Sequence, residues 1–216
     1  MPDLRFQIEN ATVVPYAMAP TLALKLQIAN AVAGQKIHTV ALRCQIEIEV
    51  TRRRYLPEEQ SRMRDLFGEP ERWSRTLRNL LWTNTSVVVP SFQDTTTTDL
   101  PVPCTFDFNV ATTKYLNGLA EGDIPLLLLF SGTVFYAGPN SDLRVAPISW
   151  DKETKFRLPL KVWKDMMDAF YPNTAWLCLR RDIFEELHRF KMERGIPTWE
   201  QSFEVMLALL TEEAVR

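Results

Sequence analysis

Four charged residues near the C-terminus have the types and spacing that acid–base chemistry could use. Asp165 and Asp168 fall on one face of an expected helix, as a pair of catalytic carboxylates would. Lys161 and Lys164 lie beside them, so a solvated face with ion pairs is the more typical interpretation of this spacing. We therefore assign no catalytic residue to this segment.

The histidines and cysteines do not form a metal-binding motif. A zinc site needs convergent His and Cys ligands, but the chain has two histidines and three cysteines without paired spacing. His38 opens an expected strand, and His188 lies beside Glu185 on an expected helix face. A packed strand-end residue and a solvated helix residue are the more typical roles at such positions. The sequence predicts no metal site.

Cys44 and Cys104 both fall on the inward phase of expected strands, which leaves three roles open. A nucleophile would need a neighbouring histidine or a helix N-terminus to lower its pKa, and neither position suggests one. An inter-sheet disulfide of the immunoglobulin type would be accompanied by a tryptophan shortly after the first cysteine, and that tryptophan is absent. We favour buried, free thiols at both positions and at Cys178, because free cysteine is among the most buried residue types.

Glycine-rich phosphate-binding loops are also absent. The seven glycines are widely separated, and neither the G-x-G-x-x-G nor the G-x-x-x-x-G-K-[ST] pattern occurs. The G-x-S-x-G pattern of many hydrolases is missing as well. We therefore predict a non-catalytic protein without a cofactor.

Arginines concentrate between residues 51 and 78. This stretch holds eight arginines against five acidic residues, a net charge of +3 on a chain whose total is −2. Trp73 and three of these arginines form the candidate partner-binding set: Arg72, Arg75 and Arg78. Arginine and tryptophan are enriched at protein–protein hot spots, whereas no aromatic platform or reading motif for nucleic acid accompanies them. We therefore expect this stretch to bind another protein and not nucleic acid.

The composition is that of an ordinary globular protein. Of the 216 residues, 46% are hydrophobic and 24% are charged, which excludes the collagenous, disordered and disulfide-framework classes. The N-terminal segment lacks the features of a secretory leader, and the most apolar run, residues 124–130, is shorter than the roughly 20 residues that span a bilayer. An odd number of cysteines suits reduced thiols. We expect a cytoplasmic protein without a membrane segment.

Alternation of apolar and polar residues with a period of two predicts strands over most of the first 158 residues. The expected strands are residues 4–9, 21–29, 40–50, 86–92, 95–110, 124–137, 143–148 and 154–158. The second and third of these are predicted to form a hairpin across Asn30–Lys36. Pro101 and Pro103 suggest an edge strand, and Gly132 suggests a bulge.

Apolar residues at helical spacing predict helices in the remaining segments. The expected helices are residues 57–68, 70–81, 111–119, 159–171, 182–195 and 198–210. In the second of them the arginines of the candidate partner-binding set form a stripe opposite Trp73. Asp182 is expected to cap the helix that it opens, and Thr198 and Gln201 form a capping-box pattern. Residues 175–180 are ambiguous and fit a last short strand.

Strands first and helices last indicate an α+β fold with segregated layers. We predict an antiparallel β-sandwich-like body over residues 1–158, interrupted by a helical insertion at 57–81. Residues 159–216 are expected to form a C-terminal helical layer packed on the same core. No internal repeat or low-complexity tract occurs.

Seven segments carry a resemblance that extends from one end of the chain to the other. They are residues 15–22 (PYAMAPTL), 42–46 (LRCQI), 52–55 (RRRY), 65–70 (DLFGEP), 81–83 (LWT), 100–104 (LPVPC) and 197–200 (PTWE). On these segments the chain resembles a bacterial family of uncharacterised proteins of about this length, which is associated with gene neighbourhoods of nickel–iron uptake hydrogenases. The resemblance implies an accessory or assembly role, with a hydrogenase subunit or maturation factor as partner, and it transfers no catalytic residue.

The order of the expected elements is also similar to that of the tetrameric protein-export chaperone. Our leading hypothesis is a non-catalytic accessory or scaffold protein that binds another protein. One alternative is an oligomeric, client-binding chaperone with an exposed apolar groove. The other is an enzyme whose site has no recognisable motif. The sequence leaves the oligomeric state open.

Overall fold

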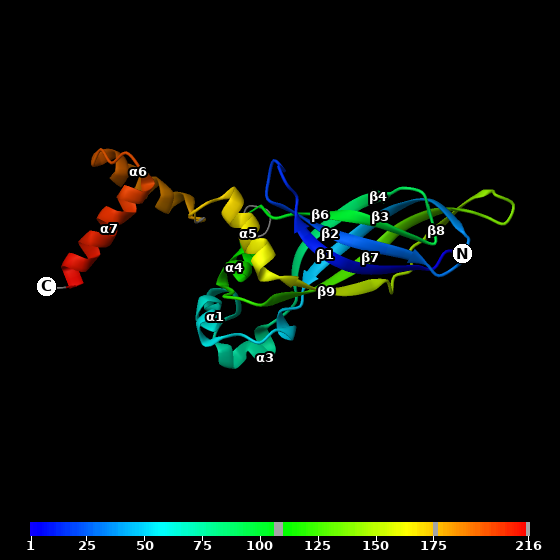
Figure 1. Ribbon diagram of the computed structural model, residues 1–216. Coiled ribbons are helices and arrows are strands. Elements are labelled where there is room, and N and C mark those ends of the chain that lie inside the picture. Colours follow the sequence, from blue (N-terminus) through cyan, green and yellow to red (C-terminus); the bar gives the residue numbers. More distant parts are fainter. Residues whose placement is uncertain (106–109, 175–176, 215–216) are drawn as a thin grey trace. The chain divides into compact units, whose positions relative to one another are not determined.

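The computed structural model describes residues 1–105, 110–174 and 177–214, and the chain divides into two compact units (Figure 1). The first unit is Met1–Thr174 and the second is Ala175–Arg216. The first contains two antiparallel sheets and several helices, and the second is helical. The predicted α+β class, with antiparallel sheets and helices at the C-terminus, is confirmed.

Three strands form the first sheet, in the order β1, β2, β6. Their bounds are β1 (Leu4–Val13), β2 (Thr21–Asn30) and β6 (Thr95–Pro103). Every second side chain of β2 from Leu22 to Ile28 is fully buried, as a period of two requires. β6 lies at the edge of this sheet, as Pro101 and Pro103 predict, because proline cannot donate a hydrogen bond to a neighbouring strand.

Six strands form the second sheet. Their bounds are β3 (Lys36–Ile48), β4 (Leu80–Val89), β5 (Phe92–Gln93), β7 (Asp123–Ala137), β8 (Leu143–Pro147) and β9 (Glu153–Pro159). β3 pairs with β4 and β5 along one edge and with β7 along the other. The far edge of β7 pairs with β9 along its first half and with β8 along its second half.

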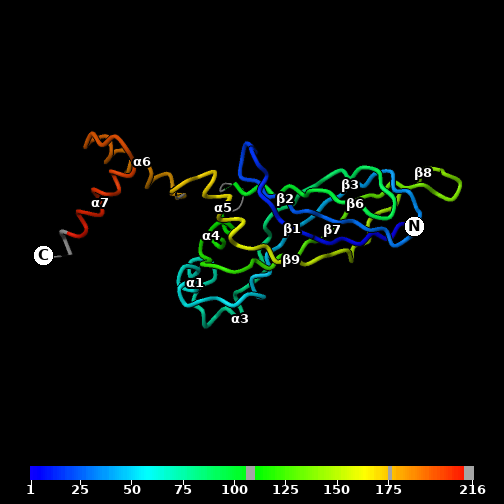
Figure 2. Tube along the Cα trace, in the orientation of Figure 1, coloured from blue at the N-terminus to red at the C-terminus, as the bar shows by residue number. Residues whose placement is uncertain are grey.

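The two sheets pack face to face around one core. Phe6 of β1 and Phe130 of β7 stack between the sheets, with ring centroids 4.3 Å apart. The Thr85 hydroxyl of β4 donates a 2.7 Å hydrogen bond to the carbonyl of Pro101 in β6, which joins one edge of each sheet. Figure 2 shows the strands of the two sheets running alongside one another. The antiparallel sandwich predicted for the body therefore forms.

The hairpin predicted between the second and third strands is wrong. β2 pairs with β1 and β6, whereas β3 belongs to the other sheet, so the chain crosses between the sheets after Asn30. The Asn30 side-chain oxygen supports this crossing by accepting hydrogen bonds from the N–H groups of Asp3 and Val32, at 3.1 and 3.2 Å. One apolar face per strand fits both a hairpin and two facing sheets, so alternation alone does not distinguish them.

The helical insertion is shorter than its pattern predicts. The segment between β3 and β4 contains η1 (Val50–Arg52), α1 (Pro57–Arg62), α2 (Arg64–Phe67), η2 (Pro70–Arg72) and α3 (Trp73–Thr76). α1 begins at Pro57 as predicted, but α3 ends at Thr76, and the helix predicted to reach residue 81 is wrong. Leu80 and Leu81 already pair with the end of β3, because inter-strand hydrogen bonds override the helical spacing of these leucines.

At Gly132 the pairing of β7 is continuous with β3, but it is interrupted on the opposite edge, where β9 gives way to β8. The register between β3 and β7 runs unbroken through the pair formed by Leu42 and Gly132. The φ of Gly132 is +139°, and a Cβ atom there would lie 2.0 Å from the carbonyl oxygen of Ala41. Close approach of the neighbouring backbone therefore explains the glycine.

Two helices complete the first unit, near their predicted ranges: α4 (Val110–Gly118) and α5 (Leu160–Phe170). α5 contributes four buried side chains to the core: Leu160, Trp163, Met166 and Met167. The strand predicted over 95–110 is represented by β6, and residues 106–109 lie outside the described residues. Among the described residues, no helix combines the length and the apolar character needed to cross a membrane.

The second unit consists of α6 (Arg181–Glu193) and α7 (Trp199–Ala214). Arg180, and not Asp182 as predicted, is the N-cap residue of α6. The Thr198 hydroxyl accepts a 3.2 Å hydrogen bond from the Gln201 N–H, as the capping pattern predicts. Residues 177–180 form no strand, and residues 175–176 lie outside the described residues. Because this unit is separate, the packing of residues 159–216 as one layer on one core stays a prediction.

Candidate functional site

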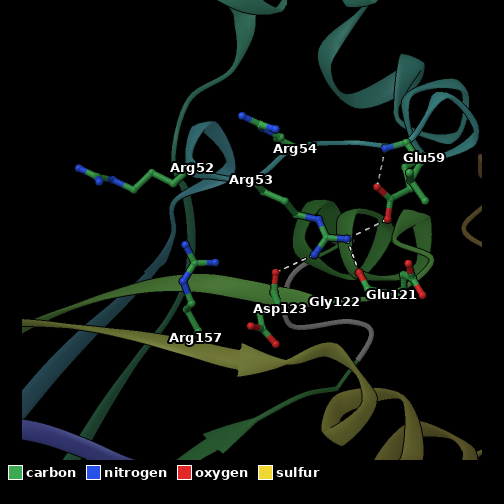
Figure 3. A pocket seen from close by; sticks show the side chains of 9 residues that line it. Arg52, Arg53, Arg54, Glu59, Glu121, Gly122, Asp123 and Arg157 are labelled. Carbon is green, nitrogen blue, oxygen red and sulfur yellow. Dashed lines mark hydrogen bonds and ion pairs between the residues drawn. The ribbon is translucent and has the colours of Figure 1, made fainter.

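A cleft of about 450 Å³ opens in the first unit where three segments converge (Figure 3). They are the connection between β3 and α1, the turn between α4 and β7, and the end of β9. The lining residues are mostly charged: Arg52, Arg53, Arg54, Leu56, Glu59, Glu121, Gly122, Asp123 and Arg157. We call this site the arginine cleft.

Arg53 ties the three segments together. One terminal nitrogen of its guanidinium donates a 2.6 Å hydrogen bond to the carbonyl of Asp123, and the other donates to the carbonyl of Glu121 and, at 2.9 Å, to the Glu59 carboxylate. Only 10% of the Arg53 side chain is exposed. Its third nitrogen, Nε, is buried and has no hydrogen-bond partner among the described residues. The side chain is therefore held rigidly by its two terminal nitrogens.

Glu59 is a buried carboxylate that the structure keeps ionised. It sits in the first turn of α1, where one oxygen accepts a 2.9 Å hydrogen bond from the Leu56 N–H and the other a 2.8 Å bond from the Ala120 N–H. Burial would raise the pKa of the Glu59 carboxyl, but these two N–H groups and the Arg53 guanidinium outweigh burial and lower it. A carboxyl with a lowered pKa is a poor general acid near neutral pH, so its role here is structural.

The other three arginines of the cleft are more exposed than Arg53. The Arg52 guanidinium lies 2.8 Å from the Glu49 carboxylate, and 59% of its side chain is exposed. Arg54 and Arg157 are exposed and form no ion pair with any described residue. Figure 3 shows these three side chains on one side of Arg53, reaching the cleft from the β3–α1 connection and from β9. The arrangement can bind oxyanions, because guanidinium groups donate charge-assisted hydrogen bonds to them.

Two tyrosines, the half-buried Tyr55 and the fully buried Tyr115, lie near the segment that carries Arg53. The hydroxyls of Tyr55 and Tyr115 are 3.0 Å apart, and the Tyr55 hydroxyl donates a 2.6 Å hydrogen bond to the carbonyl of Val50. Burial raises the pKa of both phenols, that of Tyr115 to about 12. Both are therefore neutral near pH 7 and serve the packing of the insertion against α4.

The candidate partner-binding residues do not form the single stripe that a continuous helix would give. Arg72 ends η2, Arg75 lies in α3, and Arg78 follows α3, and all three are exposed. Trp73 is only 7% exposed, and its indole N–H donates a 3.0 Å hydrogen bond to the carbonyl of Gly68. Trp73 therefore packs in the core, edge-on against the rings of Tyr55 and Phe67, and leaves the surface to the arginines.

The other residues singled out in the sequence stay apart. Among the described residues, no three His, Cys, Asp or Glu side chains lie close enough together to hold a metal ion. Asp165 forms an ion pair with Lys161 at 2.6 Å, as the helical spacing predicts. Cys44 and Cys104 are free and buried, so they form no disulfide, whereas Cys178 is free but exposed, contrary to its predicted burial. Burial raises the pKa of the Cys44 and Cys104 thiols to about 12, which excludes reactive thiolates near neutral pH.

Thiol labelling should separate the three cysteines. At pH 8 in native buffer, a disulfide reagent such as DTNB is expected to react rapidly with Cys178 and far more slowly with Cys44 and Cys104, because the two are buried and protonated. In denaturant all three should react at similar rates. The Cys178→Ser variant serves as the control and should lose the rapid phase. A thiol that still reacts rapidly in Cys178→Ser would contradict the burial of Cys44 and Cys104.

The sequence did not predict the arginine cleft, and none of the candidate partner-binding residues lines it. The run Arg52–Arg54 and the acidic first turn of α1 are visible in the sequence. The acceptors of Arg53 at Glu121 and Asp123 lie 68 and 70 residues further along the chain, and Arg157 comes from another strand. No local spacing in the sequence predicts that these residues meet in the folded protein. The one signal for this site was the position of Arg53 directly after an expected strand, because an arginine that becomes buried there needs hydrogen-bond acceptors from other segments.

Residues 1–215 match the family of unknown function DUF6084. The chain belongs to this family. The match covers almost the whole chain, so the resemblance to an uncharacterised family seen in the sequence is confirmed. The match extends across both compact units, and the arginine cleft is therefore part of the segment that matches DUF6084. No curated protein matches the chain.

Two solved structures show a distant likeness. One is described as a late embryogenesis abundant protein, with 16% identity, a TM-score of 0.32, and coverage of 74% of this chain and 73% of that chain. The other is described as the ApaA protein from Bordetella pertussis, with 14% identity, a TM-score of 0.25, and coverage of 73% and 95%. Both TM-scores are below 0.5, so neither likeness bears on the function of this DUF6084 member.

Proposed function

We propose that this protein is a non-catalytic accessory protein that binds another protein through its C-terminal helical unit. One observation carries the proposal. No hydrophobic side chain among residues 177–211 is buried. The large apolar side chains exposed there are Leu177, Leu179, Phe184, Met192, Leu207, Leu209 and Leu210. Such an accumulation on one small unit is typical of a protein-binding surface.

Packing inside the unit leaves this apolar surface uncovered. α6 and α7 contact each other around Trp199, whose ring centroid lies 5.4 Å from that of Phe184 and 6.4 Å from that of Phe203. The Lys191 ammonium lies 5.8 Å from the centre of the same indole. Two helices can bury only the stripes that face each other, and apolar residues of α7 extend beyond that stripe. A two-helix unit of this size gains much of its stability from what it binds.

The chemistry of the first unit supports a non-catalytic role. Its best-formed polar cluster holds Glu59 ionised against Arg53, and its buried thiols have raised pKa values. Neither group is suited to general base or nucleophilic catalysis near pH 7. The exposed arginines Arg72, Arg75 and Arg78 offer a second, charged surface for a protein partner.

The resemblance to a family found near hydrogenase genes suggests which partner to test first. A subunit or a maturation factor of a nickel–iron hydrogenase is the proposed partner, and the cytoplasm is the proposed compartment. Purification of the tagged protein at native expression should then retain that partner in stoichiometric amount. Leu207→Glu combined with Leu210→Glu should release it, because charges would replace an apolar contact.

A matched control separates this effect from general damage. Val88→Glu with Leu143→Glu places the same charges on exposed apolar positions of the sandwich, which are 72% and 65% exposed, and should leave the partner bound. Glutamate at Arg72, Arg75 and Arg78 should weaken binding without changing the melting temperature, which tests the charged surface. Retention of the partner by the Leu207/Leu210 variant, or a wild-type protein that purifies alone, would contradict the proposal.

A further inference from the structure

Two guanidinium groups in the arginine cleft have no counter-ion among the described residues. Arg53 is neutralised by Glu59 at 2.9 Å, and Arg52 by Glu49 at 2.8 Å. Arg54 and Arg157 are exposed, line the same cleft and have no such partner. They come from the β3–α1 connection and from β9, so the fold, and not the sequence run alone, brings them to one opening.

Positive charge continues beyond the cleft along β9. A neighbouring hollow of about 280 Å³ shares Arg52 and Arg157 with the cleft and adds Lys155. The Lys155 ammonium lies 4.0 Å from Glu49, which is already paired with Arg52, so one carboxylate serves two cations. The combined surface therefore has more cationic than anionic groups on the side of Arg157.

Arg53 forms a rigid base for the cleft. Its guanidinium is fixed by two carbonyls and one carboxylate, so the segments that carry the exposed arginines are held in place before binding. A volume of about 450 Å³ falls in the range of small-molecule sites.

We infer that the arginine cleft binds the phosphate or pyrophosphate group of a small molecule. Arginine forks donate paired, charge-assisted hydrogen bonds to phosphate oxygens. Arg52, Arg54 and Arg157 line the cleft from two segments of the chain, and several guanidinium groups suit an anion with several peripheral oxygens better than a single carboxylate. None of the residues proposed to bind the protein partner lines this cleft, so the two proposals are independent.

Two carboxylates of the cleft should repel a bound anion, so removing them should change the binding affinity in the opposite direction to removing arginines. Glu121 and Asp123 also line the cleft, so with Glu59 there are three acidic residues against four arginines and a formal charge of +1. The carboxylates of Glu121 and Asp123 form no ion pair with a described residue, so removing their charge leaves the Arg53 contacts with the backbone carbonyls in place. Removal should therefore strengthen anion binding.

The experiment titrates inorganic pyrophosphate into the full-length protein by isothermal titration calorimetry at constant ionic strength. Wild type should bind with saturation at one site. Arg54→Ala with Arg157→Ala should bind about a hundredfold more weakly, because two charge-assisted hydrogen-bond donors are lost. Arg75→Ala with Arg78→Ala removes the same charge from the exposed insertion and should bind as wild type does. Glu121→Gln with Asp123→Asn should bind several-fold more tightly.

Three results would overturn the inference. The first is the absence of saturable binding to wild type, and the second is equal weakening in the two arginine double variants, which would indicate only general charge attraction. The third is tighter binding of the tricarboxylate citrate than of pyrophosphate, which would exclude a phosphate site. Unchanged melting temperatures of the variants show that the cleft stays folded, so a loss of binding is a property of the arginines.

Discussion

Replacing Glu59 with glutamine is expected to lower the free energy of unfolding by about 3–5 kcal/mol, because the Arg53 guanidinium would then be buried without its counter-ion. The side chain of Glu59 is 1% exposed and that of Arg53 is 10% exposed, so water cannot replace the lost charge. The carboxylate also accepts the N–H groups of Leu56 and Ala120, which a glutamine side chain can satisfy only in part. Urea unfolding monitored by tryptophan fluorescence at pH 7 would measure the change.

The same variant should change how stability depends on pH. The pKa of the Glu59 carboxyl is lowered from 4.5 in the folded protein, so the ionised group stabilises the fold above that value. Wild type should lose this contribution as pH falls through the lowered folded-state pKa, and Glu59→Gln should lose less over the same interval. Glu58→Gln is the matched control, since Glu58 is exposed in the same turn and should change stability little. Equal effects of the two substitutions would mean that Arg53 does not depend on Glu59.

Alanine at position 132 should destabilise the sandwich by more than about 4 kcal/mol, enough to prevent folding at 37 °C. The added Cβ would lie 2.0 Å from the carbonyl oxygen of Ala41, a backbone atom held in the ladder between β3 and β7. The φ of +139° adds strain for any residue with a side chain. Soluble yield and the circular dichroism spectrum of Gly132→Ala would show the loss.

Gly34→Ala separates the two causes of that loss. Gly34 also has a positive φ, +71°, but the Cβ atom of alanine would meet only the Gln93 side chain at an ordinary 3.9 Å. It should therefore cost only about 1–2 kcal/mol and remain folded. Similar costs at both positions would show that backbone conformation, and not the contact with Ala41, requires glycine at 132.

The strands were predictable because their signal is local. The period-two patterns of β2 and β3 come from burial on one face, and every second residue from Leu22 to Ile28 is fully buried. The partners of those strands were not predictable in the same way, and the expected hairpin of β2 with β3 is wrong. Strand pairing is a long-range property that one strand's face does not encode.

The insertion shows where a local signal misleads. Leucines at helical spacing suggested a helix to residue 81, but Leu80 and Leu81 pair with β3. Trp73 was expected at a surface because its type suits interfaces, yet its ring fills a space between Tyr55 and Phe67. Inter-strand hydrogen bonds decided the first case and aromatic packing within the insertion decided the second, and both override the preferences of short stretches of chain.

The arginine cleft divides in the same manner. Arg52, Arg53 and Arg54 are adjacent in the sequence, and their charge is evident there. Only the fold shows that Arg53 is held by Glu59 and the 121–123 turn, while Arg54 and Arg157 have no counter-ion among the residues that the structure describes. Arg53 is largely buried and Arg54 is exposed because of where the chain leaves β3, and neither residue determines that position alone.

The sequence by itself determined the globular type of composition, the α+β class, the positions of most strands and helices, and membership in a family whose match covers residues 1–215. These follow from residue types and local periods, which act over a few neighbours. The tertiary structure alone decided which strands share a sheet, which cysteines and arginines are buried, and which charged groups meet at the cleft. The physical reason is that the positions of Arg53, Tyr55 and Glu59 depend on hydrogen bonds to residues 60 or more positions away, and such contacts exist only after folding.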